Sequence, residues 1–149
     1  LNDMVKGFEA GGAKDKFHPE AYWDYGQWSI GYGTKSHKGE TITKAGATKR
    51  LNEELAVAAK AVNKYNKTYK WKPHELDALT SFAYNVGSIV QLTAKGTRSR
   101  EQIAAKMLEY KRATVKGKRV TLKGLENRRK AERDLFLNGY PKPPAVAKR

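Results

Sequence analysis

The sequence predicts a single α+β domain, because two different periodicities follow one another along its 149 residues. Residues 20–43 alternate aromatic and small residues and contain several glycines, which is typical of short antiparallel strands joined by tight turns. From Ala47 onward, apolar residues recur with a helical period. We therefore expect a small sheet region followed by a larger helical region, with a ligand groove between them.

The first half of the chain contains a helix at each side of the predicted strands. Residues 1–9 carry one apolar stripe and predict a short helix. Gly11 and Gly12 interrupt helical order before the strands begin. Thr43 suits the N-cap of the next helix. The residues expected on the buried face of that helix are Ala47, Leu51, Leu55, Ala58 and Val62.

Capping signals define two helices in the second half. Pro73 suits a first helical position, and Gly87 can end that helix. Ser99 and Gln102 have the spacing of a capping box, which predicts another helix directly after them.

The end of the chain is rich in basic residues. Residues 111–124 are basic and contain glycine, and we interpret them as a loop. A last helix is expected over residues 125–137. The composition then changes to proline and lysine, so we expect one domain over residues 1–139 and a basic Pro-rich tail over 140–149.

Composition limits the partners and cofactors. Thirty basic and 15 acidic side chains leave a net charge of +15, which indicates a polyanionic partner such as nucleic acid, anionic lipid or an acidic cell-surface polymer. The chain has no cysteine, and its three histidines are far apart without ligand-like neighbours. We therefore expect no metal site and no cofactor. No run of residues approaches the length of a membrane span.

Two carboxylates have a setting that suits glycosidic bond cleavage. Glu9 ends the first predicted helix, and Asp24 lies among aromatic and glycine residues with Ser29 shortly after it. One carboxylic acid can protonate a leaving oxygen while a second carboxylate activates water or attacks the sugar. By themselves these residues also fit plainer interpretations: a solvated Glu at a helix end and an Asp that forms a turn. Of the neighbouring Tyr22, Trp23 and Trp28, we expect at least half to be core residues.

Several longer motifs resemble the phage-type lysozymes, the endolysin family of glycoside hydrolases. Phe8-Glu9, "AYWDYGQWSIGYGT" at 21–34 and "GETIT" after it are similar to the N-terminal half of that family. "LDALTSFAYNVG" at 76–87 resembles its central helix, and "GLENRRKAERDLFLNG" at 124–139 its closing helix. The resemblance spans about residues 4–139.

The resemblance implies a lysozyme-like fold with the active-site groove between a small antiparallel sheet lobe and a larger helical lobe. It also implies catalytic roles: Glu9 as general acid, Asp24 as the carboxylate that activates water, and Ser29 as the hydroxyl that orients the water. The residues expected to bind substrate are Gly31, Tyr32, Asn85 and Arg128, the last of which pairs with the general acid in the family.

Three departures from the family concern the groove. Fourteen residues separate Glu9 from Asp24, which is longer than usual and indicates an insertion around Gly11 and Gly12. Four residues separate Asp24 from Ser29, one fewer than in some members. Ser29 also stands where most members have threonine, so the hydroxyl is kept but the methyl group that restricts its rotamer is lost.

The activity implied by the resemblance is hydrolysis of the β-1,4 bond between N-acetylmuramic acid and N-acetylglucosamine in bacterial peptidoglycan. Two alternatives stay open: a lytic transglycosylase, which cuts the same bond without water, and a catalytically inactive wall-binding or virion module. The expected partners are peptidoglycan and anionic outer-membrane lipopolysaccharide rather than nucleic acid. We expect a phage-encoded monomer that acts on the host wall in the periplasm of a Gram-negative cell.

Overall fold

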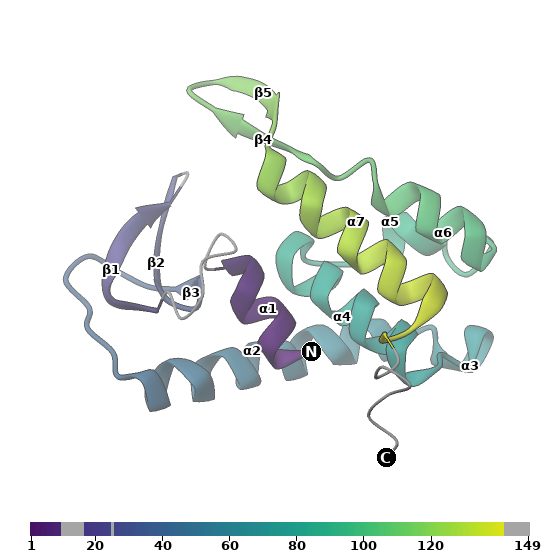
Figure 1. The fold of residues 1–149 in the computed structure, drawn as a ribbon, viewed down its shortest axis with the longest axis horizontal. Helices are drawn as coiled ribbons and strands as arrows, with labels where there is room; N and C mark the ends of the chain where they lie inside the picture. Colours follow the sequence, from purple (N-terminus) through teal and green to yellow (C-terminus); the bar gives the residue numbers. More distant parts are fainter. Residues whose placement is uncertain (10–16, 25, 142–149) are drawn as a thin grey trace, which may run out of the picture.

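The structure is a computed structural model that describes residues 1–9, 17–24 and 26–141. Figure 1 shows a small sheet region at the left and a helical region at the right, with helix α1 between them. Helix α2 runs beneath both and contacts β2 and β3 as well as α4. The predicted α+β architecture and the order of its two regions are confirmed.

The sheet region is one three-stranded antiparallel sheet in the order β1-β2-β3. Its strands are β1 (His18–Asp24), β2 (Gln27–Gly31) and β3 (Thr34–Lys35). Asp24 pairs directly with Gln27, so the connection between β1 and β2 is short. Gly26 lies in this connection with a φ of 98°, a backbone conformation that glycine adopts without steric cost. Asp24 is therefore at the tip of a hairpin.

Two helices connect the regions. Helix α1 spans Asn2–Glu9 and α2 spans Lys44–Asn63. Thr43 caps α2 as expected, its hydroxyl accepting a hydrogen bond of 3.1 Å from the backbone N–H of Gly46. Every residue predicted for the inner face of α2 is buried: Ala47, Leu51, Leu55, Ala58 and Val62.

The helical region contains the main core. Its elements are α3 (Asn66–Tyr69), α4 (Pro73–Val86), α5 (Val90–Thr93), α6 (Arg100–Met107) and α7 (Lys123–Asn138). The starts of α4 and α6 are as predicted, with Pro73 in the first turn and a capping box between Ser99 and Gln102. The short helices α3 and α5 were not expected. The largest fully buried apolar side chains of this core are Phe82, Phe136, Leu79, Ile89, Leu92, Ile103 and Met107.

The predicted basic loop is wrong in part, because most of it forms a β-hairpin. Strands β4 (Arg112–Val115) and β5 (Lys118–Thr121) pair antiparallel and project from the helical region near the start of α7 (Figure 1). Lys116 and Gly117 connect them with φ values of 51° and 79°, the positive values that a two-residue hairpin turn requires. A lysine in this conformation is uncommon, which is why the turn is hard to read from the sequence.

The described chain ends beside its own beginning. The Leu1 ammonium lies 3.5 Å from the Tyr140 hydroxyl, which donates a 2.5 Å hydrogen bond to Asp77 of α4. Burial and this carboxylate raise the pKa of Tyr140 to about 12. The tail predicted to begin at residue 140 falls outside the described residues from 142 onward. In the described part of the chain, no helix has the length and apolarity needed to cross a membrane.

Candidate active site

Asp24 and Ser29 lie on the same face of the small sheet. Ser29 pairs with Tyr22, and Asp24 pairs with Gln27 two residues closer to the hairpin tip on each strand. Directly paired residues project to the same face and alternate residues share it, so Tyr22, Asp24, Gln27 and Ser29 form one face. Strand register thus places the two predicted catalytic residues of the sheet region on one face.

The Ser29 side chain is fully buried, yet its hydroxyl has no hydrogen-bond partner among the described residues. Buried hydroxyls are nearly always satisfied, so a buried one without a partner needs an explanation. A hydroxyl of this kind can hold a water molecule or a substrate atom. In contrast, Asp24 at the hairpin tip is half-buried and reaches solvent.

Glu9 is the last residue of α1, as predicted, but its side chain lies outside the described part of the structure. The proposed insertion at Gly11 and Gly12 also lies outside it. The preceding turn of α1 is described. There the Lys6 ammonium lies over the Tyr32 ring, 4.6 Å from the ring centroid. It also donates a 3.2 Å hydrogen bond to the Thr48 hydroxyl of α2. The C-terminal half of α1 therefore contacts the loop after β2.

Tyr32 and Gly31 connect the sheet to the helices. Tyr32 is half-buried and packs against the cluster of Val5, Leu51 and Leu55. Gly31 has a φ of 64°, and a Cβ added to it would lie only 2.8 Å from the Cβ of Ala47. This glycine allows the sheet to approach α2 closely. That packing role is visible in the structure, while the predicted contact of both residues with substrate stays a prediction.

Arg128 is buried in a polar network between α7 and α4. Its side chain is 4% exposed and that of Glu132 is 0% exposed, with 3.1 Å between Nε and Oε2. Arg128 also donates to the Ser81 carbonyl at 3.2 Å, and the Ser81 hydroxyl donates to Glu132 at 2.5 Å. Arg128 therefore belongs to the interior between the two helices and not to a solvated face of α7.

Arg129 extends the same network toward Asn85. It is fully buried, its guanidinium carbon lies 4.8 Å from the Phe82 ring centroid, and its Nε lies 3.1 Å from Glu132 Oε1. Its Nη2 donates a 2.6 Å hydrogen bond to the Asn85 side-chain oxygen. Arginine has no acceptor, so this bond directs the NH₂ group of the exposed Asn85 away from Arg129.

Sequence reasoning missed three members of this network: Ser81, Arg129 and Glu132. A signal was present, because Arg128 and Arg129 precede Glu132 by four and three residues, the spacing of neighbours on one helix face. Nothing in that spacing shows that the face is buried, and such pairs are usually solvated. The packing of α7 against α4 decides this.

The aromatic residues at the hairpin tip are more exposed than predicted. Trp23 is 62% exposed, and Tyr22 and Trp28 are half-buried, so none of the three is a core residue. The prediction that at least half belong to the core is wrong. The buried part of the small sheet is at its other end, where Ile30 is fully buried and Gly31 meets α2.

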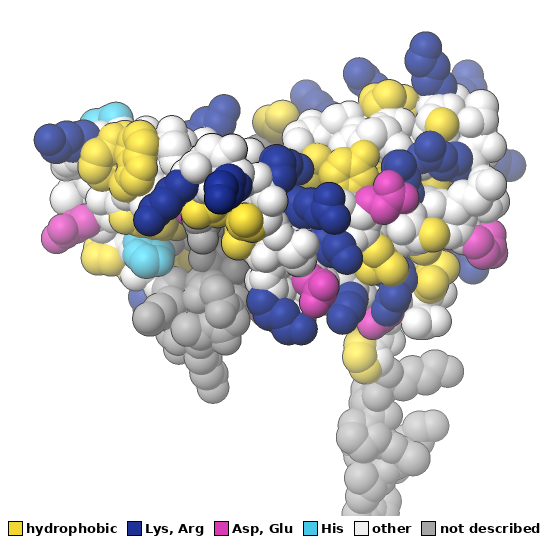
Figure 2. All heavy atoms as spheres, turned by 90° about the horizontal axis from the view of Figure 1, so that it is seen from above, with side chains coloured by type: hydrophobic (Ala, Val, Ile, Leu, Met, Phe, Trp, Pro, Cys, Tyr) yellow, Lys and Arg dark blue, Asp and Glu magenta, His cyan; other side chains and the backbone are white. Residues whose placement is uncertain are grey.

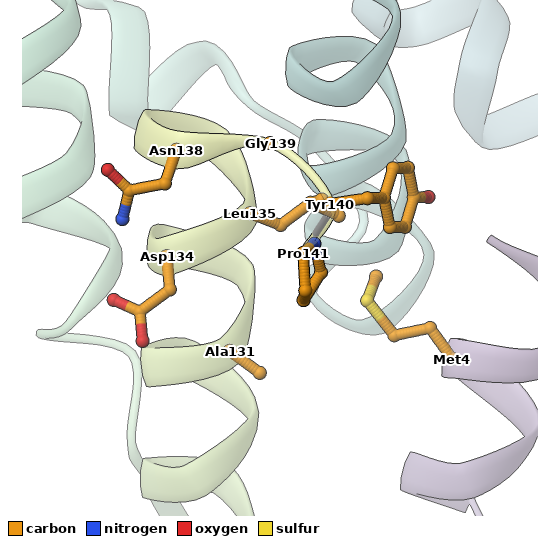
Figure 3. A pocket seen from close by; sticks show the side chains of 8 residues that line it. All are labelled: Met4, Ala131, Asp134, Leu135, Asn138, Gly139, Tyr140 and Pro141. Atoms are coloured by element: carbon orange, nitrogen blue, oxygen red, sulfur yellow. The ribbon is translucent and has the colours of Figure 1, made fainter. Parts of the chain in front are cut away.

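A pocket of about 520 Å³ lies elsewhere, between α1 and the end of α7. Its walls are mainly apolar and include Met4, Leu135 and Tyr140 (Figure 3). The polar groups of Asp134 and Asn138 point to the other side of α7 from Met4 in this view. None of the predicted site residues lines this pocket.

Basic side chains dominate one face of the molecule. Figure 2 shows Lys and Arg side chains in a row from the sheet region at the left to the helical region at the right, with fewer acidic side chains between them. This arrangement agrees with the excess of basic residues in the sequence. It also fits an extended anionic partner.

Comparisons with known proteins agree with the resemblance. Residues 13–132 match the family model described as phage lysozyme, a range that begins after Glu9. A curated endolysin of Acyrthosiphon pisum secondary endosymbiont phage 1 is 30% identical over 118 residues, which cover 74% of this chain and 80% of that protein.

Solved structures show the same fold. An endolysin from Escherichia coli O157:H7 phage FAHEc1 is 33% identical with a TM-score of 0.72, covering 95% of this chain and 93% of its own. The muramidase domain of SpmX from Asticaccaulis excentricus is 26% identical with a TM-score of 0.72, covering 92% of this chain and 94% of its own. The lysozyme-like arrangement of the small sheet and the helices is confirmed.

Proposed function

Because the chain belongs to the phage lysozyme family, we propose that it cleaves the β-1,4 bond between N-acetylmuramic acid and N-acetylglucosamine. The family relationship makes it a lysozyme-type glycoside hydrolase that acts on peptidoglycan. The choice of bond and the residues that perform the reaction are the proposed part.

In the proposed reaction Glu9 is the general acid that protonates the leaving glycosidic oxygen. Asp24 accepts a proton from water as the water attacks the anomeric carbon, and Ser29 orients that water. The product is a new reducing end, and the two carboxyl groups together neither gain nor lose a proton over the full cycle. Tyr32, Gly31 and Asn85 contribute to sugar binding, and Arg128 acts beside the general acid.

The observation that carries this proposal is the Asp24–Ser29 face. A carboxylate and a buried hydroxyl without a partner among the described residues share one side of the hairpin. Such a pair suits the binding and activation of water. It also favours hydrolysis over a lytic transglycosylase, in which a water-activating pair has no task. An inactive wall-binding module has no use for either residue.

Arg128 is the proposed partner of the general acid. Its charge is buried and held by Glu132 and Ser81, so its position is set before substrate arrives. A fixed cation favours the ionised form of a nearby carboxylate, whereas burial of that carboxylate favours the protonated form. A general acid needs a balance between these effects. We propose that Arg128 supplies the cation that favours the ionised form of Glu9, and that burial of Glu9 opposes it.

Mass spectrometry of digested peptidoglycan tests the reaction and the acid together. Purified sacculi are incubated with the wild-type protein, with Glu9→Gln, and with Glu53→Gln as a control at an exposed acid on α2. We expect reducing N-acetylmuramic acid ends from the wild type and the control, and a loss of at least about 10²–10⁴-fold for Glu9→Gln. Anhydro ends would establish the transglycosylase instead, and intact glycan the inactive module. A fully active Glu9→Gln would remove Glu9 from the mechanism.

We also propose a phage-encoded monomer that works on the host wall in the periplasm, with anionic outer-membrane lipopolysaccharide as a second partner. The basic face in Figure 2 supports an electrostatic component of attachment. Lysis of whole cells should then fall steeply as salt rises, because salt screens exposed charges. Hydrolysis of a short soluble oligosaccharide of alternating N-acetylglucosamine and N-acetylmuramic acid should change much less. Parallel salt curves for the two substrates would contradict this attachment.

A further inference from the structure

A pair of tryptophans lies on the side of the small sheet opposite the candidate catalytic face. Trp23 and Trp28 are directly paired across β1 and β2, and each alternates with a residue of the Asp24–Ser29 face. Trp23 is 62% exposed, more than Tyr140, another exposed aromatic residue, at 50%. The two rings meet edge to face, with centroids 5.5 Å apart and an angle of 75°. The two indole rings thus pack against each other on this side of the sheet.

A row of polar side chains continues from this pair. The Ser36 N–H donates a 3.1 Å hydrogen bond to the Trp28 carbonyl, which continues the β2–β3 ladder and places Ser36 opposite Trp28 on the same face. The Ser36 hydroxyl donates to Glu40 at 2.5 Å. The Arg50 guanidinium of α2 donates two hydrogen bonds to the same carboxylate, of 3.1 and 2.7 Å.

This polar row is partly exposed and held in place. The side chains of Arg50 and Glu40 are 33% and 19% exposed. Hydrogen bonds from Arg50 and Ser36 lower the pKa of Glu40 to about 2, so the carboxylate stays ionised under ordinary conditions. The surface therefore offers fixed acceptors and donors beside a large aromatic ring, and the opposite charges of Glu40 and Arg50 nearly cancel.

We propose that Trp23, Trp28, Ser36, Glu40 and Arg50 form a second saccharide-binding surface that holds a stretch of the peptidoglycan glycan strand outside the catalytic face. The C–H groups of a pyranose ring pack on an indole face, whose π electrons attract them. Sugar hydroxyl and N-acetyl groups can bond to planar carboxylate and guanidinium groups. The balanced charge of the polar row favours a largely neutral glycan over a polyanion.

The location of the surface also favours the glycan. Trp23 precedes Asp24 in the chain, and the two side chains leave the same hairpin tip on opposite faces. A glycan polymer that enters the catalytic face has further sugars within reach of this tip, and a neighbouring strand of the wall can contact it as well. The second surface rests on the proposed function, because it assumes that the wall glycan is the substrate. Its role is to retain the enzyme on the polymer between cleavage events.

The test compares Trp23→Ala and Trp23→Phe with the wild type, and with Val57→Ala as a control at an exposed apolar residue of α2. Co-sedimentation with purified sacculi is measured at low and high salt. We expect Trp23→Ala to weaken binding about tenfold at both salt concentrations, and Trp23→Phe to retain most of it. Turnover of sacculi should fall with the binding, while kcat/KM for a short soluble oligosaccharide of alternating N-acetylglucosamine and N-acetylmuramic acid stays within about twofold.

Nuclear magnetic resonance detects direct saccharide binding at Trp23, which a purely structural role of Trp23 would not produce. Titration of a neutral chito-oligosaccharide into the wild-type protein should shift the indole N–H signal of Trp23, and Arg50→Lys should weaken that shift. Equal binding of wild type and Trp23→Ala to sacculi would overturn the proposal. Equal losses on polymer and short substrate would also overturn it, since Trp23 would then act through the catalytic face. If the wild type releases no reducing ends, the proposed function fails, and the binding and resonance measurements still decide the second surface.

Discussion

The buried Ser29 hydroxyl of the sheet region differs from the buried ion network around Arg128 in the helical region. In the sheet region, the fully buried Ser29 hydroxyl has no partner among the described residues. In the helical region, Arg128 and Glu132 are buried together and bonded to each other and to Ser81. In the proposed function the sheet supplies this hydroxyl to a reactant, whereas the helices hold their charges in a fixed arrangement.

This difference predicts that substitutions in the two regions affect different properties, activity in one and stability in the other. A group that bonds to a reactant contributes to the reaction and little to folding. A buried ion network contributes to the preorganised charge around a site, and breaking it leaves a charge without compensation in the interior. Substitutions in the sheet region should therefore affect mainly activity, and substitutions in the network should affect mainly stability.

The largest expected effect is on activity, from Asp24→Asn. The amide cannot accept a proton from water, so peptidoglycan hydrolysis should fall about 10²–10⁴-fold. The thermal midpoint should hardly change, because Asp24 is half-buried at a hairpin tip. Glu20→Gln, at an exposed acid of the same strand, is the control and should keep its activity. Robust hydrolysis by Asp24→Asn would make Asp24 a turn residue.

The next effect is on stability, from Glu132→Gln. Both arginines of the network would keep their buried charges without the carboxylate, so the free energy of unfolding should fall by about 3–5 kcal/mol. Urea denaturation measures this directly. Glu109→Gln is the control, because Glu109 is 60% exposed in a surface pair with Lys106. It should change stability by less than about 1 kcal/mol. Similar losses in the free energy of unfolding for Glu132→Gln and Glu109→Gln would show that the buried network does not stabilise the helical region more than a surface pair does.

The smallest effect compares one ion pair in each region as the pH falls. Glu40 pairs with Arg50 in the sheet region, and Glu75 pairs with Arg100 in the helical region. The pKa of Glu40 is lowered to about 2. Burial raises the pKa of Glu75, but bonds from Arg100 and from the Lys72 N–H outweigh burial and lower it overall. A lowered pKa means that each carboxylate stabilises the fold above its unfolded pKa, and that this stabilisation disappears as pH falls through the folded value.

Acid titration of two variants measures these contributions. Glu75→Gln should lose about 1 kcal/mol or less at neutral pH, because Arg100 is partly exposed. Below about pH 4.3, where an unfolded glutamate becomes protonated, the difference from the wild type should shrink. Glu40→Gln should converge with the wild type only close to pH 2. A difference that grows as the pH falls would have the wrong sign and would contradict both assignments.

The sequence by itself determined the elements whose signals are local. Thr43, Pro73 and Ser99 mark helix starts because their side chains or ring act on backbone groups within one turn. The buried stripe of α2 follows from spacing alone. The hairpin of β4 and β5 was missed because Lys116 takes a positive φ that a lysine rarely adopts.

Only the tertiary structure decided the environment of the site residues. Strand register assigned Asp24 and Ser29 to one face and Trp23 to the other, and a shift by one residue would exchange the faces. The contact between α4 and α7 buried Arg128 and Arg129, which the sequence alone could equally have left in solvent. Local signals depend on neighbours along the chain. The burial of a side chain, and the sheet face on which it lies, depend on segments that are distant in sequence. No single segment carries that information.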